Sequence, residues 1–340
     1  MGEIDRSLSA LRKTLIELLD EESATGEEDA VYRDMILNIA LLRNEKLDLA
    51  EIRLLNKAFR ELRHALRIFK VYRKIPKAAI FGSDRTSADH SDYRMAVEFG
   101  RKLAKKGWML ITGGASGIME AALVGAGVQK SFGLNILLPF EQEANKIIQG
   151  NSKLMYFKYF FTRKLMFLKE SEATVLFPGG FGTFDEGFES FTLVQTGKAK
   201  PRPIVLVDPP GSRFWESTLD LLKRNMADRN LVSPDDLLLM RHFHDADEAV
   251  GEICGFYSNY HSSRFLKDRF IIRLRKKVTA PQLKRLDREF KGILTKGAFE
   301  VMKDFKEDDE QDPKLCRVVF YFDRSSFSRL RMLVDVLNSF

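Results

Sequence analysis

The chain has 340 residues, enough for one large α/β domain plus an accessory unit. Its net charge of +7 comes from 55 basic and 48 acidic residues, which fits an anionic ligand. No zinc-finger spacing, RNP-type aromatic strand or long basic tail indicates a nucleic-acid partner.

The two cysteines and the start of the chain indicate the compartment. Cys254 and Cys316 form no CxxC pattern, which argues against a disulfide framework and suits a reducing environment. The start MGEIDRSLSALRK lacks a basic segment followed by an apolar one, and no window approaches about 18 uninterrupted apolar residues. We therefore expect a cytoplasmic protein with no membrane partner.

The N-terminal part, residues 1–74, is predicted to be a helical extension. Apolar residues repeat at steps of three and four over residues 8–18, 31–42 and 52–69, and an acidic, glycine-containing run separates the first two stripes. The third stripe needs an apolar cover, either the core domain or a twin helix in a dimer. A packed cap and a regulatory module both remain open.

Residues 75–261 are predicted to form a Rossmann-like α/β domain, a parallel sheet with helices on both faces. Short apolar runs are separated by helix-length segments: KAAIF (77–81), WMLIT (108–112), FGLNILL (132–138), ATVLF (173–177) and PIVLV (203–207). Continuous apolarity is typical of strands covered on both faces. Alternating strands and helices predict the parallel sheet.

Residues 262–340 are predicted to form a small α+β appendage. Its expected elements are strands over 270–274 and 317–322 and helices over 279–297 and 323–340. Thr279 is predicted to open the first helix, and Asp323 or Ser325 to cap the second. The acidic run FKEDDEQDPK between them is predicted to be a surface loop that needs no partner.

Three of the predicted core strands run into glycine-containing loops that precede helices. The loops are Phe81-Gly82-Ser83, Thr112-Gly113-Gly114-Ala115-Ser116-Gly117 and Pro178-Gly179-Gly180-Phe181-Gly182-Thr183. Because parallel strands end at one edge of a sheet, the loops are expected to converge on one crevice. Helix N-termini bind phosphate, and glycine lets the backbone approach phosphate oxygens. Any one loop alone would also serve as an ordinary strand-to-helix turn.

Motifs that are absent from the loops exclude some classes of phosphate ligand. No GK[ST] follows a glycine loop, and Asp185 stands where the third glycine of a dinucleotide fingerprint belongs. The sequence therefore supports neither triphosphate hydrolysis nor hydride transfer. A mononucleotide remains.

Acidic residues follow the third loop. Asp185, Glu186 and Glu189 are predicted to begin its helix, where carboxylates stabilise the helix dipole but repel an anionic ligand. A group with positive character is therefore expected between the carboxylates and the anionic phosphate. The sugar carbon of a breaking N-glycosidic bond has this character. Upstream, Arg163 is a candidate phosphate anchor or a surface cation. Lys164 is predicted to be a solvated charge.

The histidines indicate no metal. Only His242 and His244 are close in sequence, in what is predicted to be a late loop without a third ligand. We interpret them as surface residues.

The segments GLNILLPFEQEAN (133–145) and YFKYFFTRKLMFLKESEATVLFPGGFGTFDEGFESFTLVQTGK (156–198) resemble the LOG family, named after the plant Lonely Guy enzymes and often mislabelled lysine decarboxylases. The hallmark PGGxGTxxE is complete from Pro178 to Glu186. The resemblance covers residues 75–250 and implies a nucleoside 5′-monophosphate phosphoribohydrolase without metal or organic cofactor, working as a homodimer or higher homo-oligomer.

The resemblance also implies the site. Glu186 and Arg163 match the family's catalytic residues. The positions that match its substrate and phosphate contacts are Gly82, Ser83, Gly113, Gly114, Gly117, Gly179, Gly180, Gly182 and Thr183.

The expected reaction is hydrolysis of a purine nucleoside 5′-monophosphate, AMP-like or a cytokinin nucleotide, to free base and ribose 5-phosphate. Two alternatives stay open: a non-catalytic nucleotide sensor that uses the same crevice, and a helical interaction protein built on a retired enzyme. The presence of Arg163 and Glu186 favours the enzyme, because a mere binder has no need of the carboxylate.

Overall fold

The computed structural model describes a chain of two compact units, Met1–Arg60 and Glu61–Phe340. Its described residues are 13, 15–17, 26–138, 144–303, 308, 310 and 312–340. No helix among them is long and apolar enough to span a membrane.

Two of the three predicted N-terminal helices are confirmed. They are α2 (Glu27–Asn44) and α3 (Leu49–Lys70), and α2 buries none of its residues. The last turns of α3 belong to the larger unit, where Ala65 and Phe69 are buried in its core. The stripe over residues 8–18 lies almost wholly outside the described residues.

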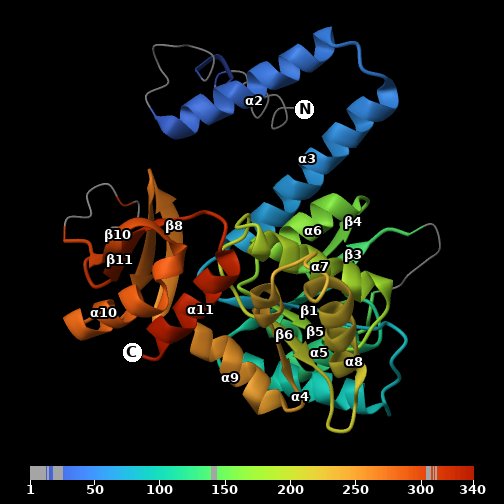
Figure 1. Ribbon diagram of the computed structural model, residues 1–340. Coiled ribbons are helices and arrows are strands. Elements are labelled where there is room, and N and C mark those ends of the chain that lie inside the picture. The colour runs from blue at the N-terminus through green and yellow to red at the C-terminus, as the bar shows by residue number, and fades with distance from the viewer. Residues whose placement is uncertain are drawn as a thin grey trace. The chain divides into compact units, whose positions relative to one another are not determined.

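The core is a parallel sheet of seven strands in the order β4-β3-β2-β1-β5-β6-β7 (Figure 1). The strands are β1 (Lys77–Phe81), β2 (Met109–Thr112), β3 (Ser131–Ile136), β4 (Leu154–Phe157), β5 (Ala173–Leu176), β6 (Ile204–Val207) and β7 (Met240–Phe243). The five predicted strands are confirmed, and the edge strands β4 and β7 were missed. Both edge strands are only partly buried, so neither has the continuous apolar run of a central strand.

Helices cover both faces of this sheet, which confirms the Rossmann-like prediction. They are α4 (Ser91–Lys105), α5 (Ile118–Ala126), α6 (Phe160–Lys169), α7 (Phe181–Gln195), α8 (Phe214–Leu222) and α9 (Ala246–Phe256). Alternate residues of β1 divide between the layers: Ile80 packs with α4, α5 and α9, whereas Phe81 packs with α3, α6 and α8. The core therefore has one hydrophobic layer on each side of the sheet.

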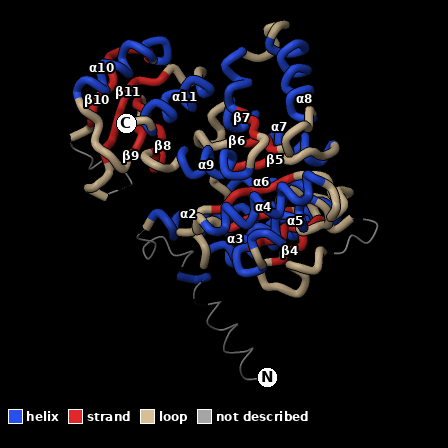
Figure 2. The backbone as a smooth tube through the Cα atoms, turned by 90° about the horizontal axis from the view of Figure 1, so that it is seen from below, coloured by secondary structure: helices blue, strands red, loops and turns tan. Residues whose placement is uncertain are grey.

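The C-terminal part forms a second, antiparallel sheet in the order β10-β11-β9-β8. Its elements are β8 (Tyr260–Leu266), β9 (Arg269–Leu274), α10 (Ala280–Glu289), β10 (Leu294–Val301), β11 (Cys316–Phe322) and α11 (Phe327–Asn338), and Figure 2 shows both helices beside the strands. The predicted α+β character is confirmed. Strands β8 and β10 were not predicted, and the start of β10 was placed in a helix.

The two predicted helix starts differ in outcome. Thr279 opens α10 as predicted, since its backbone N–H and its hydroxyl both donate to Gln282. The cap predicted for α11 is wrong, because that helix begins at Phe327 with Ser326 as its N-cap, one residue after Ser325 and three after Asp323. Asp323 instead accepts hydrogen bonds from the backbone N–H groups of Ser325 and Ser326, which stabilises the turn before the helix.

The acidic run before β11 does need a partner at one position. Asp308 is buried, and its carboxylate accepts hydrogen bonds from Arg273 at 2.9 Å and from Arg317 at 2.8 Å. These two arginines are direct cross-strand neighbours on β9 and β11. A carboxylate between them offsets the repulsion of two like charges. The prediction of a loop without partners is therefore wrong for Asp308.

Candidate active site

The strand order places β1 beside β5, and connections run in opposite directions on either side of this point. Ligand crevices of open α/β sheets lie at such a position, beyond the carboxyl ends of the strands. The loops meet there: the Ser83 N–H donates to the Pro178 carbonyl at 3.0 Å, and the Ile118 N–H donates to the Ser83 carbonyl at 2.9 Å. The three glycine-containing loops therefore converge.

A cavity of about 680 Å³ opens at this convergence. Eight of the predicted site residues line it: Gly82, Ser83, Gly113, Arg163, Gly180, Gly182, Thr183 and Glu186. An ideal Cβ at Gly180 or Gly182 would meet nothing within 4 Å, so the backbone of this loop borders open space. A ligand can thus approach the start of α7 closely.

The other three predicted glycines do not line this cavity but shape the loops. Gly114 and Gly117 have φ angles of 73° and 67°, which L side chains rarely adopt. A Cβ on Gly179 would lie 2.1 Å from the Thr183 hydroxyl oxygen. Their contribution is therefore to loop geometry.

Arg163 of α6 and Glu186 of α7 lie together in the cavity wall, with a guanidinium nitrogen 3.6 Å from a carboxylate oxygen. Both side chains are largely buried. The guanidinium also lies over the rings of Phe160 and Phe167, at 5.0 and 5.7 Å from the ring centroids. Its Nε is buried and has no hydrogen-bond partner among the described residues. Such a donor needs an acceptor from a ligand or water.

Burial raises the pKa of Glu186 to about 7, although Lys164 and Arg163 act in the opposite direction. Burial also lowers the pKa of Arg163, against the pull of Glu186 and Asp185. An arginine stays protonated under such conditions. The pair therefore combines a fixed cation with a carboxyl group that changes protonation near neutral pH.

Lys164 belongs to the same cluster, and its prediction as a solvated charge is wrong. Its side chain is only 14% exposed, and its ammonium lies 2.9 Å from Asp185, 2.7 Å from Glu189 and 3.6 Å from Glu186. Burial alone would lower the pKa of Lys164, but the hydrogen bonds to Glu189 and Asp185 raise it. The acids at 185, 186 and 189 share one face of a helix, a spacing that could have indicated a facing cation.

The start of α7 also differs from the prediction. The helix begins at Phe181, with Gly180 as its N-cap, and its first turn holds no acidic residue. Glu186 therefore lies beyond the first turn, where the helix dipole offers little stabilisation. Stabilisation of the helix dipole therefore does not explain why position 186 carries a carboxylate.

Several further cavity residues were not predicted: Arg85, Met119, Phe160 and Phe181 line it as well. Phe181 is 96% exposed at the rim, at the variable position of the PGGxGT hallmark. A large exposed aromatic ring at a cavity rim is uncommon and offers a stacking surface.

The prediction that His242 and His244 are surface residues without a third partner is also wrong. His242 lies on β7, and both imidazoles contact the buried carboxylate of Asp208. Asp208 directly follows β6 and is remote from the histidines in sequence, so no local pattern indicated it.

Comparisons with known proteins identify the family of this chain. Residues 115–253 match the family model described as possible lysine decarboxylase. A cytokinin riboside 5′-monophosphate phosphoribohydrolase from Mycobacterium tuberculosis is 31% identical over 129 residues, which cover 36% of this chain and 67% of that protein. The chain belongs to the LOG family. The LOG family match includes Arg163 and the whole PGGxGTxxE hallmark, and it ends before the C-terminal sheet.

Solved structures resemble part of the chain more distantly. The molybdenum cofactor binding protein from Rippkaea orientalis is 17% identical with a TM-score of 0.40, over 53% of this chain and 96% of that chain. The molybdenum cofactor carrier protein from Chlamydomonas reinhardtii is 19% identical with a TM-score of 0.38, over 53% and 97%. At these values the similarity carries no argument about function.

Proposed function

We propose that this LOG family protein hydrolyses the N-glycosidic bond of a nucleoside 5′-monophosphate, releasing the base and ribose 5-phosphate. The observation that carries the proposal is the buried pair of Arg163 and Glu186, 3.6 Å apart in the wall of a cavity of about 680 Å³. The activity named for the Mycobacterium tuberculosis relative supports the same reaction class.

The start of α7 is suited to the 5′-phosphate. Phe181 and Gly182 are its first two residues, and the first N–H groups of a helix have no intrahelical acceptor. They donate to the phosphate oxygens, helped by the positive end of the helix dipole. Arg163 supplies a planar guanidinium with an unused buried donor, which favours binding of a phosphate or ribose oxygen.

Glu186 is the group that distinguishes this site from a simple anion site. In the proposed reaction, its carboxylate faces the sugar carbon C1′ and stabilises the oxocarbenium-like charge as the bond to the base breaks. It accepts a proton from the attacking water, whose oxygen forms the new bond to C1′. The base leaves with the bonding electron pair and takes a proton from solvent. A carboxyl pKa of about 7 suits such a base at neutral pH.

Lys164 acts as a positioning residue in this proposal. It contacts Glu186 on the side opposite to Arg163, since the two cations approach different carboxylate oxygens. Its bonds to Asp185 and Glu189 keep it in place. The carboxylate of Glu186 therefore lies between the two cations, which fixes its orientation.

We propose a purine nucleotide as substrate, AMP-like or a cytokinin nucleotide. The aromatic rings of Phe160 and Phe181 and the thioether of Met119 line the cavity and offer stacking surfaces for a flat base. We also propose that the enzyme works as a homodimer or larger homo-oligomer in the cytoplasm, which light scattering and fractionation would test.

A substrate panel tests the proposal. Purified protein is incubated with purine and pyrimidine nucleoside 5′-monophosphates, and with the matching nucleosides that lack the phosphate, and free base is followed by chromatography. We expect base release from at least one monophosphate and none from the nucleosides. Binding of a monophosphate without any base release would instead support the nucleotide sensor.

A further inference from the structure

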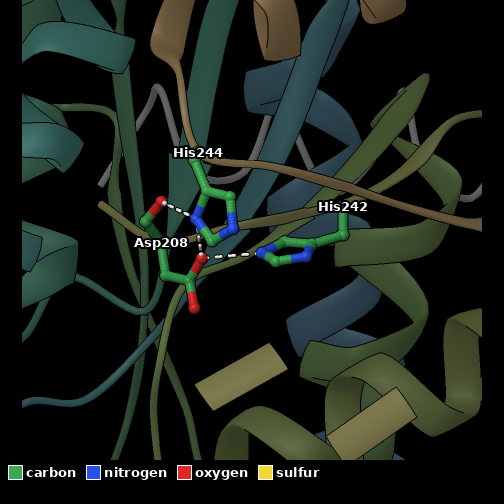
Figure 3. A group of neighbouring side chains, drawn as sticks. All are labelled: Asp208, His242 and His244. Atoms are coloured by element: carbon green, nitrogen blue, oxygen red, sulfur yellow. Dashed lines mark hydrogen bonds and ion pairs between the residues drawn. The ribbon is translucent and has the colours of Figure 1, made fainter. Parts of the chain in front are cut away.

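A second group of reactive side chains lies at the carboxyl edge of the sheet, at the ends of β6 and β7, the two strands beyond β5. Figure 3 shows Asp208 pointing toward His242 and His244. Asp208 follows β6, whose last residue Val207 pairs with Phe243 of β7. The histidines are two positions apart, so the strand period directs both to the same side. None of the three is among the described residues that line the cavity of about 680 Å³.

The ligand atoms of this group are close together. One carboxylate oxygen of Asp208 lies 2.6 Å from His242 Nε2 and 2.9 Å from His244 Nδ1. All three atoms lie within 4.8 Å of one another. Bonds to tetrahedral Zn²⁺ of about 2.0–2.2 Å hold ligand atoms about 3.3 Å apart. Shifts of less than about 1 Å would therefore suffice to accommodate an ion between them.

The surrounding groups orient these ligands. The second carboxylate oxygen of Asp208 accepts hydrogen bonds from the Ser212 hydroxyl at 2.8 Å and from the backbone N–H of Trp215 at 3.3 Å. His244 Nε2, the nitrogen that faces away from Asp208, lies 3.8 Å from a Glu216 carboxylate oxygen. This distance is too long for a hydrogen bond, but Glu216 is 47% exposed, and a small movement would bring its carboxylate to the position from which it supports a metal-binding histidine.

We propose that Asp208, His242 and His244 bind one divalent transition-metal ion of the Zn²⁺ type. Two imidazoles and one carboxylate form a zinc ligand set that leaves a fourth position for water, whereas Mg²⁺ and Ca²⁺ prefer oxygen ligands alone. Asp208 is fully buried, but the His244 side chain is 37% exposed, which gives an ion access from solvent. The ion would join the ends of β6 and β7 and would stabilise this edge of the sheet.

The same contacts would also be present if Asp208, His242 and His244 only formed hydrogen bonds with one another and bound no metal. A metal titration distinguishes these two cases. Full-length protein without an affinity tag is treated with a chelator, and Zn²⁺ is titrated by calorimetry. We expect one saturable site per chain, a higher melting temperature with Zn²⁺, no comparable effect of Mg²⁺, and visible ligand-field absorption with Co²⁺ in place of Zn²⁺.

Variants show whether these side chains hold the ion. His242→Ala and His244→Ala should each abolish saturable binding, and Glu216→Gln should weaken it about 10- to 100-fold. His64→Ala, at an exposed position of α3, is the matched control and should bind as the parent does. Asp208 is buried, so the two histidine variants decide the matter even if an Asp208 variant fails to fold. The proposal is overturned if the parent shows no saturable Zn²⁺ site, or if a folded His242→Ala/His244→Ala double variant keeps the site.

Discussion

The burial of Glu186 should cost the protein stability at neutral pH, and Glu186→Gln should recover it. The pKa of Glu186 is raised from 4.5 to about 7, mainly by burial. The folded state therefore holds a proton that the unfolded chain loses between these two pH values. Each pKa unit corresponds to about 1.36 kcal/mol, so the parent loses about 3 kcal/mol as pH rises from below 4.5 to above 7. Glutamine has nearly the same shape and does not titrate, so the variant avoids this loss.

The measurement is urea unfolding of parent and Glu186→Gln at a series of pH values. The stability of the variant relative to the parent should rise by about 3 kcal/mol between about pH 4 and about pH 8, with most of the change between the two pKa values. Asp228→Asn is the control, because this aspartate is exposed and lies outside the cluster around Glu186, and it should not reproduce the rise seen with Glu186→Gln. A stability difference between Glu186→Gln and parent that is the same at both ends of the pH range would refute the reasoning.

Four further variants test other residues. Lys164→Met removes a cation that lowers the pKa of Glu186, so the acid limb of kcat/KM against pH should move to higher pH; an unmoved limb would contradict the positioning role. Gly179→Ala should lower the free energy of unfolding in urea by about 1–3 kcal/mol, because its Cβ would lie 2.1 Å from a hydroxyl oxygen. Gly180→Ala, whose Cβ meets nothing, should leave stability unchanged but raise KM roughly tenfold, and equal stability loss in both glycine variants would count against this difference. Asp308→Asn should lower the free energy of unfolding by about 3–5 kcal/mol, since two buried arginines lose their carboxylate; a loss below about 1 kcal/mol in urea would show that this ion group is not needed.

Prediction from the sequence succeeded for strands whose residues are all buried in the same apolar surroundings. The runs of β1, β2 and β5 are mostly apolar because both faces of these strands are covered, and the glycine-containing loops follow them at the expected edge. The edge strands β4 and β7 are only partly buried and mix polar with apolar residues, so they lack the apolar run by which the central strands were recognised. Strand β8 carries polar residues at half-buried positions and was missed for the same reason.

The missed side-chain groups depend on contacts between residues far apart in sequence. Lys164 was expected in solvent because α6 alone does not reveal the acids of α7 that face it. The buried carboxylate of Asp308 lies between arginines of two strands whose register the sequence does not state. Asp208 meets two histidines through the pairing of β6 with β7. The pattern of residues along one helix or strand was enough to predict which residues are buried. Ion pairs between different elements could not be predicted without the three-dimensional fold.

The most direct test of the proposed activity is the release of adenine and ribose 5-phosphate from AMP by parent and Glu186→Gln, measured together with AMP binding. The parent should release both products in equal amounts. Glu186→Gln should still bind AMP but lose nearly all release, because Arg163 and the start of α7 are intact while the carboxylate is gone. Release by Glu186→Gln at the parental rate would contradict the role of this carboxylate in cleaving the glycosidic bond.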